Sequence, residues 1–211
     1  MGKKATIVID PGHGGKVETG GSSANNAGSP SGVLEKNITL RMAFLTRDAL
    51  LEEAQAGKHQ LTVILTRDTD TNLGLADRAL VAKKNKAALF LSIHCNASEK
   101  HSARGVETLI RPVADGNVNH AVDKAFAQKV QNAVFNAIAA HDPKTKDRGV
   151  KDQTLGVLRD ENLGPTPAAC LVELEFIDRP EVDTLLNIGP DSLNVRQDIA
   201  RAIARAMIAS L

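Results

Sequence analysis

The stretch IVIDPGHGG, Ile7 to Gly15, is an apolar run that stops abruptly at an acid, a proline and a histidine flanked by glycines. The β-branched residues at its start are typical of a buried strand, and proline and glycine are the residues that end one. Core packing does not explain a histidine between glycines. The stretch therefore predicts a buried strand whose end presents His13 beside open backbone.

Outward from this strand, short apolar runs alternate with longer segments that have apolar residues at helical spacing. The expected strands are Ala5–Ile9, Leu61–Leu65, Ala88–Ile93 and Ala168–Leu174, with Gly105–Ile110 as a further strand and Leu155–Arg159 as a weaker candidate. The expected helices are Leu40–Gln55, Leu75–Lys84, Asp123–Ala140 and Val195–Leu211. This alternation predicts an α/β fold with a mostly parallel sheet and helices on both faces. No linker divides the chain, so we expect one domain over residues 1–211.

Two segments are expected to be loops. Lys16–Gly32 is rich in Gly, Ser and Asn, and Asp142–Gln153 is charged and turn-forming. A long loop without secondary structure is unusual in a compact domain and often serves as a lid or a binding loop. We therefore expect the first loop to have a function.

Composition excludes several classes of partner. The chain has 26 Lys and Arg against 25 Asp and Glu, with no long basic block, which disfavours nucleic acid. No apolar run reaches the roughly 18 residues that a membrane helix needs, so we expect no membrane partner. Five Phe with no Trp or Tyr leave little to stack sugars or bases on. A substrate must then be held by backbone, polar groups or a metal. Cys95 and Cys170 are expected to be small buried residues.

Ligands of an open parallel sheet bind beyond the carboxyl ends of its strands. His13, His94 and Glu173 stand at such ends, and Glu35 lies where the chain returns from the long loop to the same edge. Two histidines and a carboxylate suit a zinc ion with one open position, and a further carboxylate can act as base. The pattern alone leaves open whether they bind metal, because His94 also suits a buried core position and Glu35 also suits a helix N-terminus. Cys95 should point to the face opposite His94. The other histidines, expected to be solvated, are His59, His101, His120 and His141.

Several motifs in order resemble one family, the zinc-dependent N-acetylmuramoyl-L-alanine amidases of the amidase_3 group. The matching stretches are IDPGHGG (9–15), LEKNITL (34–40), VILTRDTD (63–70), LFLSIHCNAS (89–98), RGVKDQTLGVLRD (148–160) and CLVELEFIDRPEV (170–182). The resemblance covers nearly the whole chain. It implies a roughly six-stranded sheet, one Zn²⁺ held by His13, Glu35 and His94, and Glu173 as the catalytic carboxylate. It further implies hydrolysis of the amide between the lactyl group of N-acetylmuramic acid and L-alanine of the stem peptide.

The same resemblance implies a monomer whose partner is peptidoglycan, acting on the cell wall in the periplasm or outside the cell. The chain opens without a signal peptide, so we expect either a leader that has been removed or release of the phage type. Targeting would come from a segment outside this chain, an activating partner or direct affinity for the wall. The alternatives are a catalytically inactive wall-binding or regulatory homologue and a zinc hydrolase of another amide.

The sequence departs from the family pattern in the long loop, at Glu175, and at Asp178-Arg179, where many members have Ser-Asn. The loop between His13 and Glu35 is longer than usual, and Glu175 stands where the family commonly has glycine. Glu175 has the strand parity of Glu173, so it would bind a cationic group of the stem peptide or reach solvent, and we expect solvent. Asp10 is a candidate acceptor for the second nitrogen of a ligand histidine.

Overall fold

The computed structural model describes residues 2–211. It contains one six-stranded sheet in the order β2-β1-β3-β6-β4-β5. The strands are β1 (Lys4–Pro11), β2 (Gln60–Leu65), β3 (Leu89–Asn96), β4 (Val106–Ile110), β5 (Asp147–Asp152) and β6 (Ala168–Phe176). All neighbouring pairs are parallel except β4 and β6, which run antiparallel. The carboxyl ends of β1, β3 and β6 therefore meet the beginnings of β4 and β5 at one rim.

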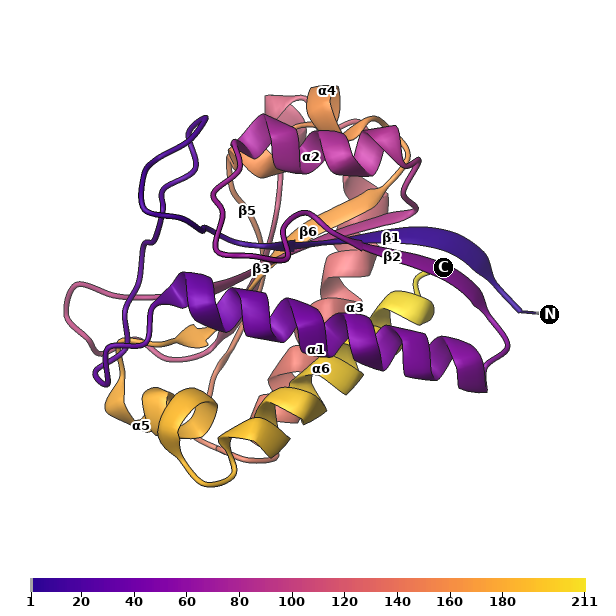
Figure 1. The fold of residues 1–211 in the computed structure, drawn as a ribbon. Coiled ribbons are helices and arrows are strands. Elements are labelled where there is room, and N and C mark those ends of the chain that lie inside the picture. The colour runs from indigo at the N-terminus through magenta and orange to yellow at the C-terminus, as the bar shows by residue number, and fades with distance from the viewer. Residues whose placement is uncertain (1) are drawn as a thin grey trace.

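Helices cover both faces of the sheet, so the predicted α/β architecture is confirmed (Figure 1). The longer helices are α1 (Glu35–Ala56), α2 (Leu75–Lys84), α3 (His120–Ala139) and α6 (Ser192–Ile208). The short ones are α4 (Asp160–Leu163), α5 (Pro180–Asp183), the 3₁₀ turns η1 (Val113–Asp115) and η2 (Gly156–Leu158), and the π turn η3 (Thr184–Ile188). Figure 1 shows α2 and α4 on one side of the sheet and α1, α3 and α6 on the other.

Alternating strand residues divide the core between these two layers. Ile7, Leu91 and Val172 pack toward α1, α3 and α6 in the larger cluster. Val8 and Phe90 pack toward α2, α4 and η2 in the smaller one. Because side chains alternate along a strand, His94 and Glu173 share the face of this smaller cluster. The parity of the strands thus places His94 and Glu173 on the α2 face of the sheet, at its rim.

One expected helix boundary and the expected secondary structure of two segments are wrong. Helix α1 begins at Glu35, five residues before the expected start at Leu40, because the loop supplies acceptors for its first N–H groups: Ala27 O for Glu35 and Asn25 Oδ1 for Lys36. The expected strand Leu155–Arg159 contains the 3₁₀ turn η2. The expected loop Asp142–Gln153 contains β5, whose polar sequence DRGVKD follows from its place at the edge of the sheet.

The loop 16–32 is tied to the body of the protein along its length. Asn72 Nδ2 donates to Val17 O at 2.9 Å and to Ser22 O at 2.7 Å. At the other end, the carboxylate of Asp183 accepts from the backbone N–H and the hydroxyl of Ser31 at 2.7 and 2.9 Å. In Figure 1 the loop extends past the carboxyl ends of the strands. Hydrogen bonds from Asn72 at one end and to Asp183 at the other therefore hold the loop in place beside the rim.

Candidate active site

Two buried arginines hold the turn that follows β1. Arg67 donates from Nε to Pro11 O at 3.0 Å and from Nη2 to Gly12 O at 2.8 Å. Arg78 donates from Nη1 to Pro11 O and from Nη2 to His13 O, both at 2.8 Å. Carbonyl groups turned inward must find donors, and these guanidinium groups supply them. The path of the backbone at His13 is thereby determined.

Glycines are required in this turn because neighbouring groups approach the backbone closely. A Cβ at Gly12 would lie 2.3 Å from the ring of His94, which stands directly over the turn. Gly14 has a φ of 135°, and a Cβ there would lie 2.2 Å from Thr71 O. His13 itself has a φ of 61°, a left-handed conformation that is uncommon outside glycine and is typical of constrained functional positions.

The rim brings His13, Glu35 and His94 together. His13 Nε2 lies 3.2 Å from Glu35 Oε2, and His94 Nδ1 lies 3.1 Å from Glu35 Oε1. One nitrogen or oxygen of each of the three groups lies within 4.8 Å of those of the other two. Zinc bonds of about 2.0–2.2 Å in a tetrahedron place neighbouring ligand atoms about 3.3 Å apart. The carboxylate-to-imidazole distances match that spacing, so the three groups can hold one metal ion.

Glu35 is the charged centre of this group. Burial of its side chain, 1% exposed, disfavours the ionised form. Hydrogen bonds and charges from His13 and His94 outweigh burial and lower the pKa of Glu35 to about 2. The pKa of His13 is raised: burial alone would lower it, but the bond to Glu35 and the charge of Glu35 prevail. Without a metal, a proton on imidazole thus compensates the carboxylate.

The second nitrogen of His13 is oriented by the long loop. Nδ1 lies 3.0 Å from both the carbonyl oxygen and the hydroxyl of Ser23. An Nδ1–H bonded to the carbonyl leaves the Nε2 lone pair directed at the Glu35 side, where a metal would sit. The carbonyl of Ser23 therefore has the orienting role that the sequence had suggested for Asp10.

The expected role of Asp10 is wrong. Its carboxylate, 1% exposed, accepts from Ser92 Oγ at 2.7 Å, Thr66 Oγ1 at 2.5 Å and Arg78 Nη1 at 2.9 Å. Burial would raise the pKa of Asp10, but Arg78 and the two hydroxyls lower it below its ordinary value. Asp10 faces the α2 layer, where Arg78 meets it, and so it acts on the turn rather than on an imidazole.

Glu173 lies beside the group, on the neighbouring strand. It is the Cα partner of His94 between β3 and β6, so both side chains leave the same face. Its Oε2 is buried and has no hydrogen-bond partner among the described residues. Burial, together with the negative charges of Glu35 and Glu107, raises the pKa of Glu173 well above its ordinary value. A buried carboxylate without a donor, next to a group that can hold a metal, is the arrangement expected of a proton-transferring residue.

Comparisons with known proteins identify the family of the chain. The model of the Amidase_3 family, described as N-acetylmuramoyl-L-alanine amidase, matches residues 7–209. The chain belongs to this family.

Individual relatives agree. The chain is 33% identical over 206 residues to an uncharacterized cell wall amidase of Bacillus anthracis, covering 94% of this chain and 34% of the relative. It is 32% identical over 204 residues to the endolysin of Bacillus phage SPP1, covering 95% and 65%. The catalytic domain of CwlV, an N-acetylmuramoyl-L-alanine amidase from Bacillus (Paenibacillus) polymyxa var. colistinus, superposes with a TM-score of 0.76 at 27% identity, covering 96% of each chain. The chain thus spans about one to two thirds of the length of these two curated relatives.

Glu175 stands where the family commonly has glycine, and we expected its side chain to reach solvent. That expectation is wrong. Glu175 is 0% exposed, and Arg104 donates to its Oε1 from Nε at 3.0 Å and from Nη2 at 2.8 Å. Thr145 Oγ1 and the N–H groups of Gly105 and Phe176 also donate to the carboxylate, each at 2.8 Å. The carboxylate therefore joins β6 to the beginnings of β4 and β5.

The other sequence-predicted residues lie as follows. Cys95 is buried on the opposite face from His94, as its parity predicted, and Cys170 is buried as well. His120 and His141 are partly exposed and pair with surface carboxylates. Sequence reasoning missed Arg67 and Arg78, because an arginine in a loop or in a helix carries no sign that it is buried.

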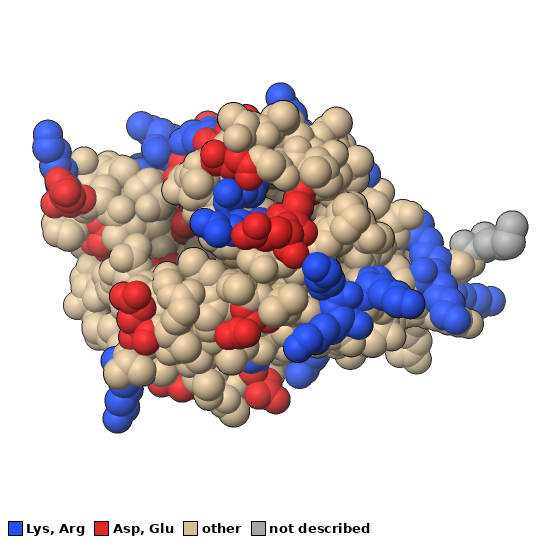
Figure 2. Space-filling view, turned by 90° about the horizontal axis from the view of Figure 1, so that it is seen from above, with Lys and Arg blue, Asp and Glu red and all other residues tan. Residues whose placement is uncertain are grey.

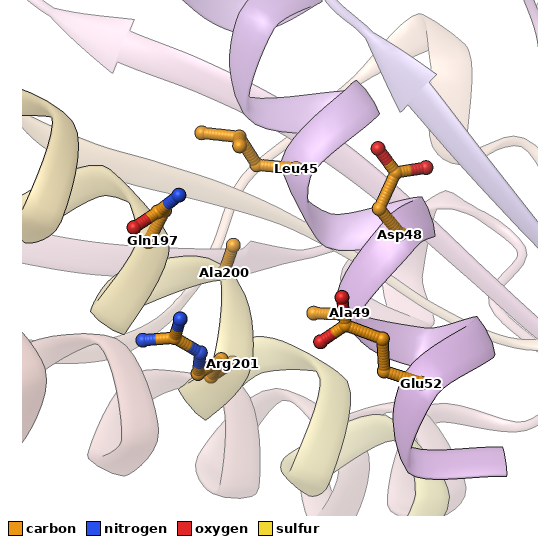
Figure 3. Close-up of a pocket in the computed structure, with 7 residues that line it drawn as sticks. All are labelled: Leu45, Asp48, Ala49, Glu52, Gln197, Ala200 and Arg201. Carbon is orange, nitrogen blue, oxygen red and sulfur yellow. The ribbon is translucent and has the colours of Figure 1, made fainter. Parts of the chain in front are cut away.

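The depressions on the surface differ in their relation to the site. A small one of about 110 Å³ opens at His13 and His94 and is bordered by Ser23, Leu75 and Val157. Another lies between α1 and α6, where Figure 3 shows Asp48 and Glu52 across from Gln197 and Arg201. Asp48 is about 20 Å along α1 from Glu35, at 1.5 Å per residue, so this second depression is not part of the site.

No described helix has the length and apolar character that a membrane span requires. The surface over α2 and α4, seen from above in Figure 2, carries acidic and basic side chains interspersed around a hollow.

Proposed function

We propose that this protein is a zinc-dependent peptidoglycan amidase that hydrolyses the amide between the lactyl group of N-acetylmuramic acid and L-alanine of the stem peptide. The observation that carries the proposal is the close group of His13, Glu35 and His94 with the buried, unpartnered Oε2 of Glu173 beside it. Membership in the Amidase_3 family supports the bond that is cut.

Zn²⁺ is the metal that the donor set fits, and His13, Glu35 and His94 would hold it. Two imidazoles and one carboxylate in a tetrahedral arrangement leave a position open, as in catalytic zinc sites. When bound, the ion supplies Lewis-acid chemistry, polarising a carbonyl and lowering the pKa of water. His13 Nε2 and His94 Nδ1 are the nitrogens nearest to Glu35, which identifies the donor atom of each ring.

Glu173 is the residue we assign to proton transfer. Its unpartnered Oε2 can accept the proton of an attacking water and return it to the leaving amine of L-alanine. A carboxylate whose pKa is raised by burial holds such a proton better than an exposed one. The buried surroundings also limit competing hydrogen bonds from bulk water. We further propose that the domain acts as a monomer on the cell wall, and that targeting comes from a segment or partner beyond this domain.

A digest of defined peptidoglycan tests the proposal. The purified chain should release peptides with free L-alanine N-termini and leave the glycan strands intact, as read by mass spectrometry. A chelator should abolish the release, and added zinc should restore it. Glu173→Gln should lose turnover while metal analysis still finds about one zinc per chain. Retained turnover in that variant would refute the role of Glu173. Fragments cut at a different bond, or wall binding without cleavage, would refute the proposed activity.

A further inference from the structure

A row of charged side chains continues from the site across the sheet. Glu173 on β6 is the Cα partner of His94 on β3 and also of Glu107 on β4. Registered partners point to the same face, so the three side chains stand side by side on the α2 face. The floor of the site therefore extends beyond Glu173, away from the loop 16–32 and toward β5.

Glu107 anchors two cations at the end of this row. Its side chain is 10% exposed, and its Oε1 accepts from Asn96 Nδ2 at 2.7 Å. Its Oε2 accepts from Arg148 Nε at 2.8 Å and from Lys151 Nζ. The side chains of Arg148 and Lys151 are 33% and 44% exposed. One carboxylate faces two cations, so the cluster keeps an excess of positive charge next to the site.

Arg148 is held in place, but the terminal nitrogens of its guanidinium make no hydrogen bond within the described residues. Only Nε bonds to Glu107, and the two terminal nitrogens have no hydrogen-bond partner within residues 2–211. The guanidinium carbon lies 5.0 Å from the ring centroid of Phe176, within range of a cation–π interaction. The side chain is thus fixed at two points. Its terminal N–H groups, which bind carboxylates in a fork, remain open.

A bulge in β5 puts both cations on the same face. Arg148 and Lys151 are an odd number of residues apart, so in a regular strand they would point to opposite faces. The β4–β5 register shifts between Val106 and Thr108, and Gly149 in β5 has a φ of 75°. An extra residue at that point reverses the parity, as β-bulges beside active sites do. The strand is therefore shaped to direct both side chains at Glu107.

We propose that Arg148, supported by Lys151, binds a carboxylate of the stem peptide on the leaving-amine side of the scissile bond. This inference rests on the proposed function. The N-acetylated glycan is neutral apart from its peptide links, whereas the stem peptide carries free carboxylates, so an open guanidinium fork selects the peptide. Strands are about 4.8 Å apart, which places this cluster roughly 10 Å from His94. At about 3.5 Å per residue, that distance reaches the second or third residue of the stem. The peptide then runs over β6 toward β5, and the glycan lies toward the loop 16–32.

Matched substrates test the inference. The second residue is offered as D-isoglutamate or as its α-amide, D-isoglutamine, on the same muramoyl-L-alanine and with the same third residue on the γ-carboxyl, so that the pair differs only in the free α-carboxylate. Arg148→Ala should lower kcat/KM about 10- to 100-fold on the acid and leave the amide nearly unchanged. Arg148→Lys, which keeps the charge without the fork, should lose part of the preference. Arg159→Ala is the matched control, since Arg159 is exposed and lies outside the row, and it should change neither substrate.

A second pair of substrates, with diaminopimelate or lysine as third residue, separates the two carboxylates. If wild type prefers diaminopimelate over lysine and Arg148→Ala loses that preference, Arg148 binds the carboxylate of the third residue. If the preference that is lost is for D-isoglutamate over D-isoglutamine, Arg148 binds the carboxylate of the second residue. Equal losses on both members of each pair, with unchanged melting temperature, would overturn the inference while leaving the amidase activity in place. A wild-type chain that cleaves none of the four would overturn the proposed function and this inference with it.

Discussion

Replacing Arg78 with methionine removes a buried guanidinium that holds the turn carrying His13. Arg78 is 1% exposed and donates to Asp10 Oδ1 at 2.9 Å and to the carbonyls of Pro11 and His13 at 2.8 Å. Methionine fills much of the same volume but donates nothing. Asp10 then remains buried with two hydroxyl partners and no cation bonded to its carboxylate.

The expected cost follows from that burial. Removing one partner of a buried ion pair costs about 3–5 kcal/mol, because the other charge is left unpaired. Both Arg78 and Asp10 have side chains 1% exposed, so solvent screens the pair little and the value needs no large discount. For a chain of this size, about 4 kcal/mol corresponds to a fall in melting temperature of roughly 8–16 °C. The carbonyl of His13 also loses its donor, so metal affinity should fall with stability.

Chemical denaturation of the chelated protein measures the loss directly. The control is Arg205→Met: Arg205 pairs with Glu53 at a similar distance, 2.7 Å, but its side chain is 70% exposed. That change should cost less than about 1 kcal/mol. In a double-mutant cycle, Asp10→Asn should recover part of the loss in Arg78→Met, because the uncompensated charge is gone. A loss below about 1 kcal/mol in Arg78→Met, or strictly additive effects, would refute the buried-pair explanation.

Three further outcomes are expected. Chelated protein should lose thermal stability as the pH rises above about 5, because the folded-state pKa values of His13 and Glu173 are raised, so that folding loses the stabilising proton of His13 and must bury the charge of Glu173. Zinc should abolish this slope, and an equal slope with zinc would contradict the assignment. Gly12→Ala should lower zinc affinity about 10- to 100-fold with an unchanged circular dichroism spectrum, since its Cβ would meet the ring of His94; unchanged affinity in a titration would contradict the close approach. Asp183→Ala should cost about 2 kcal/mol and open the loop 16–32 to limited proteolysis, because Ser31 loses its anchor; a loop that stays resistant would show that Asn72 suffices.

The sequence was sufficient for the fold because the deciding signals are local. Apolar runs such as Ile7–Ile9 and Leu89–Ile93 are buried strands, and helix α2 has the predicted bounds. The edge strand β5 was missed because a half-exposed edge strand does not need alternating apolar residues. Its glycine, Gly149, also suggested a turn, whereas it lies in a β-bulge within the strand. Strand parity also placed His94 and Cys95 on opposite faces correctly, since it depends only on the pleat.

The proposed metal ligands could be named in advance because the topology of a parallel sheet collects strand ends at one rim. The hydrogen-bond partners of the site residues could not be named in advance. Asp10 was assigned to a histidine, but hydrogen-bond choice depends on which element covers the strand, here α2 with Arg78. The same limit applies to Ser23, whose carbonyl meets His13 only through the path of a loop.

Glu173 and Glu175 show how surroundings give two like residues of one strand different roles. Glu175 has every partner it needs, because Arg104, Thr145 and Gly105 all donate to its carboxylate. Both of its oxygens are occupied by these donors, so neither is free to bind a water or a substrate. Glu173 has a buried oxygen with no donor, so its charge is costly until a proton or a cation arrives. The carboxylate that we propose for proton transfer is therefore the one that the fold leaves unsatisfied, and supplying Glu173 with a donor should stabilise the protein while reducing turnover.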